Sequence, residues 1–218
     1  MAQAAAGLTA VGRRFYDRGW VLGTSGNFSA VVSRRPLRLA ITASSVHKGT
    51  LSRRQILGID DRARVRPASA GRSSAETLLH LEILKTRDAG AILHTHSVWS
   101  TILSGLHAST GGLAIQGFEM LKGLDGVTTH EHREWIPVVE NDQDMPRLAA
   151  NVRRVLADHP SAHAFLIRRH GLYTWGRTIA DAERHVEILE FLFEAIAKEN
   201  GHGFGENSDR RSDDSRHR

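Results

Sequence analysis

The chain of 218 residues contains no cysteine, and this absence excludes several kinds of chemistry at once. Disulfide bridges, thiolate metal ligands and a cysteine nucleophile are all ruled out. A metal site in this chain must therefore be built from histidine and carboxylate side chains, a donor set that suits zinc, iron or manganese.

Long hydrophobic runs are also missing. No stretch of about 18 apolar residues occurs, so the sequence predicts no membrane span. Residues 1–7 have neither a basic region nor a long apolar core, so we expect no signal peptide and a cytoplasmic protein. Hydrophobic residues make up 40% of the chain and charged residues 24%, which is typical of soluble globular proteins.

Charge of one sign is in moderate excess: the formal net charge is +5 and the pI is near 10.2. Such a balance permits nucleic-acid binding or an anionic small substrate. The basic residues are spread along the chain and form no single stripe. We therefore expect no nucleic-acid partner and no membrane partner.

Hydrophobic spacing predicts a mixture of helices and hairpin-linked strands. The final helix, from Ile179 onward, has the clearest helical period, and Pro137 indicates an edge strand over 136–139. The length fits one large domain, and we expect one α/β domain with a largely antiparallel sheet over residues 1–200 and a disordered polar tail over 201–218. The predicted helices are 8–20, 73–87, 97–105 and 144–159, and the predicted strands are 28–33, 37–42, 55–60, 63–67, 91–96, 113–116, 164–168 and 172–175.

The stretch around His94-Thr95-His96 attracts most attention because two histidines one residue apart end an apolar run. If 91–96 is a strand, the two imidazoles point to the same side, with their Cα atoms about 6.5 Å apart. Two imidazoles at that spacing can converge on one metal ion. The alternative is a pair of ordinary polar residues at the end of a strand.

A catalytic zinc usually has three protein ligands, so a third ligand must come from elsewhere. His170 follows an apolar strand and precedes Gly171, which allows a tight bend. Its alternative role is a strand-end histidine bonded to the backbone. His130-Glu131-His132 is a second candidate of the same pattern, but its polar surroundings offer nothing to hold the ligands rigid, and we rank it below His170.

Three loops carry hydroxyl, amide and backbone N–H donors suited to an anion: 26–29, 42–45 and Ser73-Ser74. The last pair precedes a predicted helix, whose free N–H groups and dipole favour a phosphate. Each loop taken alone is equally consistent with helix caps and turns.

Together these motifs occur in an order that resembles the class II (zinc-dependent) aldolases and their relatives, over residues 8–199. The segments 92–97, 117–123 and 168–176 resemble a branch of that family that removes water from a sugar phosphate. The resemblance implies a three-layer αβα sandwich and a homotetramer with active sites near subunit interfaces. It also implies one Zn²⁺ per subunit, bound by His94, His96 and His170. The resemblance further implies a sugar-phosphate substrate held by residues of the donor loops, namely Gly26, Asn27, Ser44, Ser73 and Ser74, with Lys48 assisting.

Two glutamates match acid–base positions of the family. Glu119 matches the acid–base glutamate of the dehydratase branch, and its apolar neighbours lead us to expect partial desolvation and a raised pKa. Glu76 matches the proton-abstracting position of the aldolase branch, and we expect it to have a supporting role. The alternatives are an exposed loop carboxylate at Glu119 and a capping box from Ser73 to Glu76.

The chain departs from the family at Ser73, where proline is frequent, so this loop either gains a phosphate donor or is less rigid. An aldolase or 4-epimerase on another sugar phosphate is the nearest alternative function. Carbon–carbon cleavage often needs a tyrosine acid, and neither Tyr16 nor Tyr173 lies in a motif suited to that task. A non-catalytic interaction module is the alternative from another class, but such a module would be expected to lose the metal-binding histidines.

Overall fold

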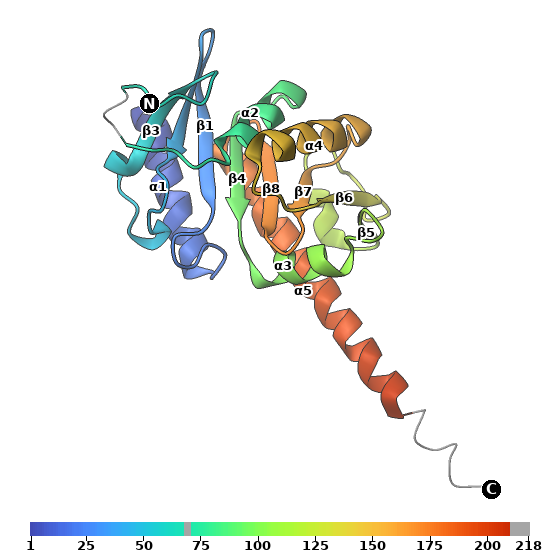
Figure 1. Ribbon diagram of the computed structural model, residues 1–218. Coiled ribbons are helices and arrows are strands. Elements are labelled where there is room, and N and C mark those ends of the chain that lie inside the picture. The colour runs from blue at the N-terminus through green and yellow to red at the C-terminus, as the bar shows by residue number, and fades with distance from the viewer. Residues whose placement is uncertain (68–70, 210–218) are drawn as a thin grey trace, which may run out of the picture.

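The computed structural model describes residues 1–67 and 71–209 and contains thirteen principal elements (Figure 1). The helices are α1 (Ala2–Asp17), α2 (Thr77–Thr86), α3 (Val98–Leu106), α4 (Met145–Asp158) and α5 (Ile179–Asp209). The strands are β1 (Asn27–Arg34), β2 (Leu37–Thr42), β3 (Ile56–Asp60), β4 (Ala91–Thr95), β5 (Gly112–Ile115), β6 (Glu134–Val139), β7 (Ala164–Ile167) and β8 (Gly171–Gly176). Short 3₁₀ turns include η1 (Lys48–Thr50), η2 (Arg53–Gln55) and η4 (Glu119–Gly123).

The eight strands form one sheet in the order β3-β2-β1-β4-β8-β7-β6-β5. All strand pairs are antiparallel except β6 with β7. The expectation of an α/β fold with a largely antiparallel sheet is therefore confirmed. The central strand β4 carries His94, is followed directly by His96, and lies between β1 and β8.

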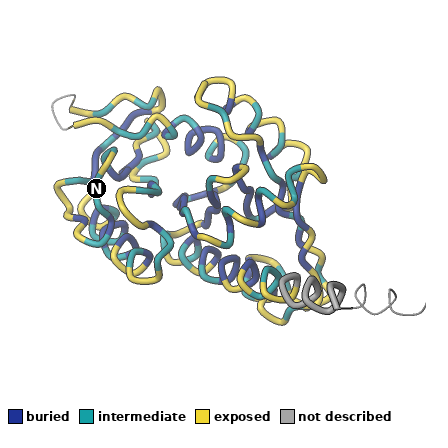
Figure 2. The backbone as a smooth tube through the Cα atoms, turned by 60° about the horizontal axis from the view of Figure 1, so that its bottom comes forward, coloured by how far each residue is buried: buried dark blue, intermediate teal, exposed yellow. Residues whose placement is uncertain are grey.

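Helices cover both faces of the sheet, which gives the expected three-layer αβα sandwich (Figure 1). On β7, Phe165 and Ile167 pack with α2 and α4, whereas the alternating residues Ala164 and Leu166 pack with α3 and α5. A third cluster joins α1 to the sheet through residues such as Phe15 and Phe28. Figure 2 shows the resulting buried segments gathered at the centre of the molecule, with exposed positions at its periphery.

Three predictions about elements were wrong. The strand β6 is internal, because β5 forms the sheet edge; Pro137 is tolerated since pairing with β7 involves only Val138 and Val139. Residues 63–67 form no strand and contribute one isolated bridge, Ile59 with Val65. The helix α2 begins at Thr77, several residues after the predicted start.

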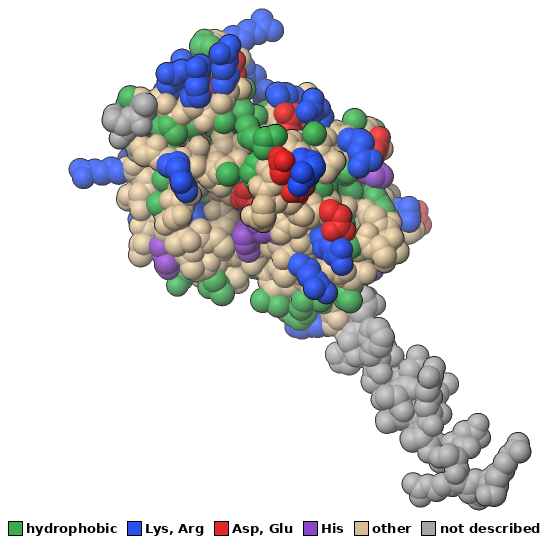
Figure 3. All heavy atoms as spheres, in the orientation of Figure 1, with side chains coloured by type: hydrophobic (Ala, Val, Ile, Leu, Met, Phe, Trp, Pro, Cys, Tyr) green, Lys and Arg blue, Asp and Glu red, His purple; other side chains and the backbone are tan. Residues whose placement is uncertain are grey.

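The long helix α5 begins with reciprocal bonds between Thr178 and Asp181, and it continues through 201–209, where a disordered tail was expected. The remainder of the predicted tail, 210–218, lies outside the described residues. None of the helices within 1–67 and 71–209 combines the length and apolar character needed to cross a bilayer. On the face drawn in Figure 3, Lys and Arg side chains recur from top to bottom, several of them gathered at the top, and form no continuous stripe.

Candidate functional site

The three predicted metal ligands lie together at one end of the central strands. His94 Nε2 is 2.8 Å from His96 Nε2, which is 3.0 Å from His170 Nε2. His94 and His96 come from the end of β4, and His170 comes from the turn between β7 and β8. The expected side-by-side placement on β4 is therefore present, and a residue distant in sequence completes the cluster.

Strand register positions the first histidine. Asn27 of β1 is opposite His94, and His94 is opposite Tyr173 of β8. The rings of His94 and Tyr173 stack at 3.9 Å, and Tyr173 stacks in turn on Phe165 of β7 at 4.9 Å. His94 is fully buried in this row, so its ring is held firmly by packing on one side.

Hydrogen bonding also determines the tautomer of His94. Its Nδ1 is 2.9 Å from the carbonyl oxygen of Leu172, which can only accept, so Nδ1 carries the proton. In the neutral ring the Nε2 lone pair then points at the other two histidines. This arrangement, in which a metal-binding histidine donates its other N–H to a carbonyl, is common in metalloproteins.

The donor set fits a divalent metal ion such as zinc. Burial lowers the pKa of His94, His96 and His170, so all three imidazoles are neutral near pH 7. Three converging neutral imidazoles are a usual ligand set for catalytic zinc, which keeps a further position open. The three histidines therefore form a cluster that could hold a metal ion.

Glu76 is the carboxylate that the chain itself brings to the histidines. Its Oε1 is 3.3 Å from His170 Nε2, and its Oε2 is 3.7 Å from His94 Nε2. Asn27 Nδ2 donates to Oε2 at 2.6 Å. The alternative role as a helix cap does not hold, because Glu76 stands at the N-cap position of α2 without a side-chain capping bond.

A pocket of about 210 Å³ opens over this cluster. Of the six predicted phosphate-binding residues, Gly26, Asn27, Ser44 and Ser74 line it, and Ser73 and Lys48 do not. Ser45 of the predicted donor loop 42–45 also lines it, and Thr24 and Ser25 add hydroxyl-bearing residues that were not predicted. Lining residues in full are Thr24, Ser25, Gly26, Asn27, Ala43, Ser44, Ser45, Ser74, Glu76, His96 and His170.

Lys48 is buried behind this pocket and is held by the backbone. Its Nζ donates to the carbonyl oxygens of Val46 at 2.9 Å and Thr24 at 3.2 Å. Burial lowers its pKa to about 8, opposed by the negative charge of Glu76. Lys48 therefore supports the loop that carries Thr24, and its charge acts on the site from a distance.

Glu119 lies outside this cluster, and the expectation of a desolvated carboxylate with a raised pKa was wrong. Its side chain is 73% exposed on η4, where it accepts a 2.6 Å bond from Lys122. That hydrogen bond and the charge of Lys122 lower the pKa of Glu119. Within one chain, Glu119 does not line the pocket over the histidines.

The second histidine pattern forms a different cluster from the one its sequence suggested. His132, but neither His130 nor Glu131, joins Glu134 and His163. His163 has an acceptor at each ring nitrogen, Glu134 Oε2 at 3.0 Å and the Asp125 carbonyl oxygen at 2.7 Å. Burial, the largest single cause, lowers the pKa of His163, but the bond to Glu134, the charge of Glu134 and the bond to the Asp125 carbonyl together raise it above its ordinary value. The polar groups of this cluster therefore satisfy one another as an ion pair around the buried Glu134.

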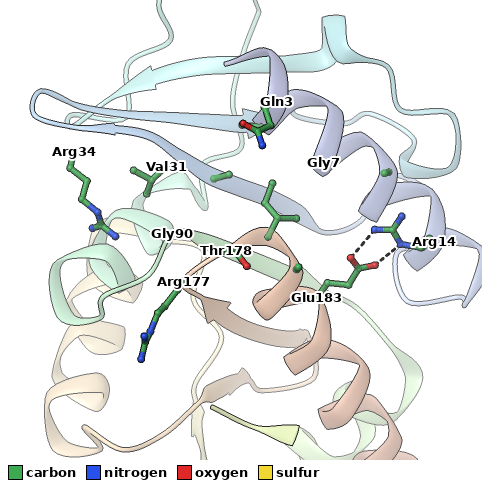
Figure 4. A pocket seen from close by; sticks show the side chains of 14 residues that line it. Gln3, Gly7, Arg14, Val31, Arg34, Gly90, Arg177, Thr178 and Glu183 are labelled. Carbon is green, nitrogen blue, oxygen red and sulfur yellow. Dashed lines mark hydrogen bonds and ion pairs between the residues drawn. The ribbon is translucent and has the colours of Figure 1, made fainter. Parts of the chain in front are cut away.

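A separate and larger cleft, of about 590 Å³, lies between α1, β1 and the start of α5. Figure 4 shows small side chains along its floor, with Arg34 and Arg177 at one end and the paired Arg14 and Glu183 at the other. The pair is bidentate, with N–O distances of 2.5 and 2.7 Å, and it joins α1 to α5. Among the described residues, histidines line the smaller pocket and not this cleft.

His80 was missed near the site, and the observed roles of Ser29 and Tyr173 were not predicted. His80 and Ser29 extend the hydrogen-bonded network behind Asn27, and Tyr173 supports His94. The sequence spacing could have indicated two of these residues. His80 follows Glu76 by four residues on a helix, and Ser29 follows Asn27 by two residues on a strand. Each spacing puts the second residue on the same face as the first.

The fold and the cluster of three histidines together indicate one class of protein. Comparison with known families identifies that class. The family described as Class II Aldolase and Adducin N-terminal domain matches residues 6–197, and the chain belongs to this family. L-fuculose 1-phosphate aldolase has the same fold, with a TM-score of 0.77 and 21% identity, over 93% of this chain and 89% of that one. The sugar-phosphate aldolase of Thermotoga maritima matches with a TM-score of 0.73 and 19% identity, over 93% and 97% of the two chains.

Three relatives nearer in sequence carry the same name. The chain is 45% identical to methylthioribulose-1-phosphate dehydratase of Marinobacter nauticus, over 88% of this chain and 92% of that protein. It is 46% identical to the enzyme of the same name from Methylococcus capsulatus, over 90% and 94% of the two chains. The corresponding protein of Sorangium cellulosum is 41% identical over 90% and 92%.

Proposed function

We propose that this chain is a zinc-dependent methylthioribulose-1-phosphate dehydratase, a lyase that acts in methionine salvage. The observation that carries the proposal is the convergence of His94, His96 and His170 beside Glu76 in a pocket rich in hydroxyl groups. Relatives that are more than 40% identical across nearly the whole chain carry this enzyme's name, and their name supports the choice of substrate.

The phosphate of the substrate is expected at the serine-lined side of the pocket. Ser44 and Ser74 present hydroxyl groups there, and Gly26 and Asn27 form the adjoining wall. Gly26 has φ +72°, and a Cβ on it would lie 2.5 Å from the His94 carbonyl oxygen, so only glycine lets this loop approach the metal-binding strand. The phosphate and the reacting carbons would thus be held by adjacent segments.

His94, His96 and His170 would hold the zinc ion. When bound there, zinc supplies positive charge that stabilises negative charge developing on the substrate's C2 oxygen. Asn27 holds the Glu76 carboxylate beside the histidines by donating to Oε2. The stacked Tyr173 and the Leu172 carbonyl fix the direction of His94.

The reaction needs one proton removed from C3 and one hydroxyl lost from C4 as water, after which tautomerisation gives the 2,3-diketone. We assign both proton transfers to Glu119, with Glu76 in support. Since Glu119 is exposed on its own chain, it would act on the pocket of a neighbouring subunit. A carboxylate with a lowered pKa is ionised near pH 7 but is a weak base, and contact with a neighbour would desolvate it and raise that pKa.

This assignment requires a homo-oligomer, which we propose is a tetramer in the cytoplasm. An apolar stripe on α3 supports it: Val98, Ile102 and Leu106 follow at four-residue steps and are 63%, 43% and 64% exposed. The stripe starts two residues after His96. A neighbouring chain seated on it would lie next to the metal centre.

Incubation of the purified enzyme with methylthioribulose 1-phosphate and detection of the diketone tests the function. Dehydration with a fully retained carbon chain is the expected result. Cleavage to two shorter fragments would instead identify an aldolase. The chain offers little for that reaction, because Tyr173 is fully buried behind His94. Absence of any turnover in the zinc-loaded oligomer would remove the dehydratase proposal.

A further inference from the structure

A histidine outside the metal cluster is connected to it through two hydrogen bonds. His80 of α2 is fully buried, and its Nε2 lies 2.5 Å from Asn27 Oδ1. Asn27 Nδ2 in turn donates to Glu76 Oε2 at 2.6 Å. We infer that His80 is a positioning residue, which acts through Asn27 to hold the Glu76 carboxylate against the metal-binding histidines. The inference deepens the proposed function and rests on it for the identity of the reaction.

The donor and the acceptor of each hydrogen bond in the series His80–Asn27–Glu76 follow from the bond to Glu76. Asn27 Nδ2 donates to Glu76 Oε2, so the amide oxygen of Asn27 faces His80 and can only accept. His80 therefore donates from Nε2. In the neutral ring Nδ1 then carries a lone pair, which accepts from the Ser29 hydroxyl at 2.7 Å.

The opposite tautomer of His80 would disturb the site. With the proton on Nδ1, the bare Nε2 would need a donor, and Asn27 would have to turn its amide toward His80. Its oxygen would then oppose the Glu76 carboxylate, acceptor against acceptor. The position of Glu76 therefore depends on which nitrogen of His80 carries the proton, although His80 touches neither substrate nor metal.

The surroundings of His80 hold it in this state. Burial lowers its pKa to about 4, so the ring is neutral near pH 7. Tyr173 packs edge-on against it with ring centroids 5.8 Å apart. Asn27 and Ser29 project from β1 to the same side, at two-residue spacing, and occupy both ring nitrogens.

A pair of substitutions separates positioning from simple packing. The amide nitrogen of glutamine reaches about as far as Nε2 of histidine, so His80→Gln keeps a donor to Asn27. The shorter His80→Asn places its amide near the Nδ1 position and leaves Asn27 without a donor. His185→Asn is the matched control, because His185 is also a buried histidine but bonds only to backbone atoms of Trp175 and Asp125.

The first readout is the affinity of each oligomer for Co²⁺, followed by its absorption spectrum, which needs no substrate. Loss of a partner outside the ligand shell typically weakens metal binding 10–100-fold. We expect about a tenfold loss or more in His80→Asn, and affinities near that of the wild type in His80→Gln and His185→Asn. Equal affinities for His80→Asn and His80→Gln would overturn the inference.

The second readout is turnover, in combination with Glu76→Gln. If His80 acts through Glu76, His80→Asn lowers kcat in the wild-type background and has little further effect in Glu76→Gln. Additive losses would contradict the inference. Failure of the proposed function would be seen differently, as a lack of diketone formation by the wild type with the Co²⁺ results unchanged.

If the variants do not fold, the wild-type protein still decides the question. Nitrogen NMR of the histidine rings reports which nitrogen of His80 carries the proton. The neutral Nε2–H tautomer near pH 7 is the expected result, and an Nδ1–H tautomer would overturn the inference.

Discussion

Thr95 Oγ1 donates a hydrogen bond of 3.1 Å to Glu190 Oε1 on the face of β4 opposite His94 and His96. Glu190 lies on α5 and is only 2% exposed. Burial raises the pKa of its carboxyl from the ordinary 4.5 to about 7. The buried carboxyl of Glu190 thus contacts one face of β4, and the predicted metal ligands lie on the opposite face.

Glu190→Gln should change how stability depends on pH. Because the folded state raises this pKa, the folded protein binds the proton more tightly, and its stability falls as pH rises from about 4.5 through 7. The glutamine variant lacks this penalty, so its stability relative to the wild type should rise by about 3 kcal/mol between pH 4.5 and pH 8. Urea unfolding at intervals across this range measures the difference. Glu131→Gln, at an exposed carboxylate, is the control, and a pH-independent difference for Glu190→Gln would contradict the prediction.

Removal of a predicted ligand should remove the metal. Alanine at His94, His96 or His170 leaves two imidazoles where catalytic zinc usually needs three, so bound metal should fall from about one per chain to near zero. Elemental analysis after dialysis measures it. His132→Ala is the matched control, since its cluster is satisfied as an ion pair. Full metal retention in any of the three alanine variants would exclude that histidine as a ligand.

Glu119→Gln should keep the metal and lose turnover by about 10²–10⁴-fold, the usual contribution of a positioned acid or base. The variant can be mixed with His94→Ala, which lacks a ligand but keeps Glu119. If Glu119 serves a neighbouring chain, mixed oligomers contain complete sites and activity returns. Comparison of the mixture with each variant alone is the measurement. Lack of recovery in verified mixed oligomers would place the action of Glu119 within its own chain.

Gly26→Ala should destabilise the protein by about 3 kcal/mol, because an L-residue at φ +72° is strained and the new Cβ meets the His94 carbonyl. Gly23→Ala is a close control. Gly23 also has positive φ, at +63°, but no atom lies within 4 Å of a Cβ placed there, so only about 1 kcal/mol is expected. Thermal and urea unfolding compare the two. Equal losses would show that the contact with β4 is unimportant.

The convergence of the three histidines could be predicted because its signals are local. The alternation of a strand places His94 and His96 on one side whatever the rest of the chain does. His170 stands out because a glycine that permits close approach follows an apolar strand: a Cβ on Gly171 would lie 2.0 Å from the Thr95 carbonyl oxygen. Strand order was not predictable in the same way, since pairing between distant segments leaves no mark in either one alone.

The errors have physical causes as well. Apolar neighbours suggested that Glu119 is desolvated, yet in the 3₁₀ turn Leu121 faces inward while Glu119 faces out and pairs with Lys122. His80 was missed because its partner Asn27 is 53 residues away, and only the packing of α2 on β1 brings them together. The spacing of Ser73 and Glu76 matched a cap, but the nearby histidines and Asn27 occupy the carboxylate instead.

The row of Asn27, His94, Tyr173 and Phe165 across four strands has a consequence for how this enzyme can vary. An insertion of one residue just before any of these positions would turn that side chain to the other face and break the row. At the other end of β1, pairing with β2 is already irregular between Val31 and Ser33, and the turn after Arg34 is exposed. The two ends of the same strand therefore differ in evolutionary freedom: the metal end is fixed in length, and the hairpin end is where loops can lengthen without loss of catalysis.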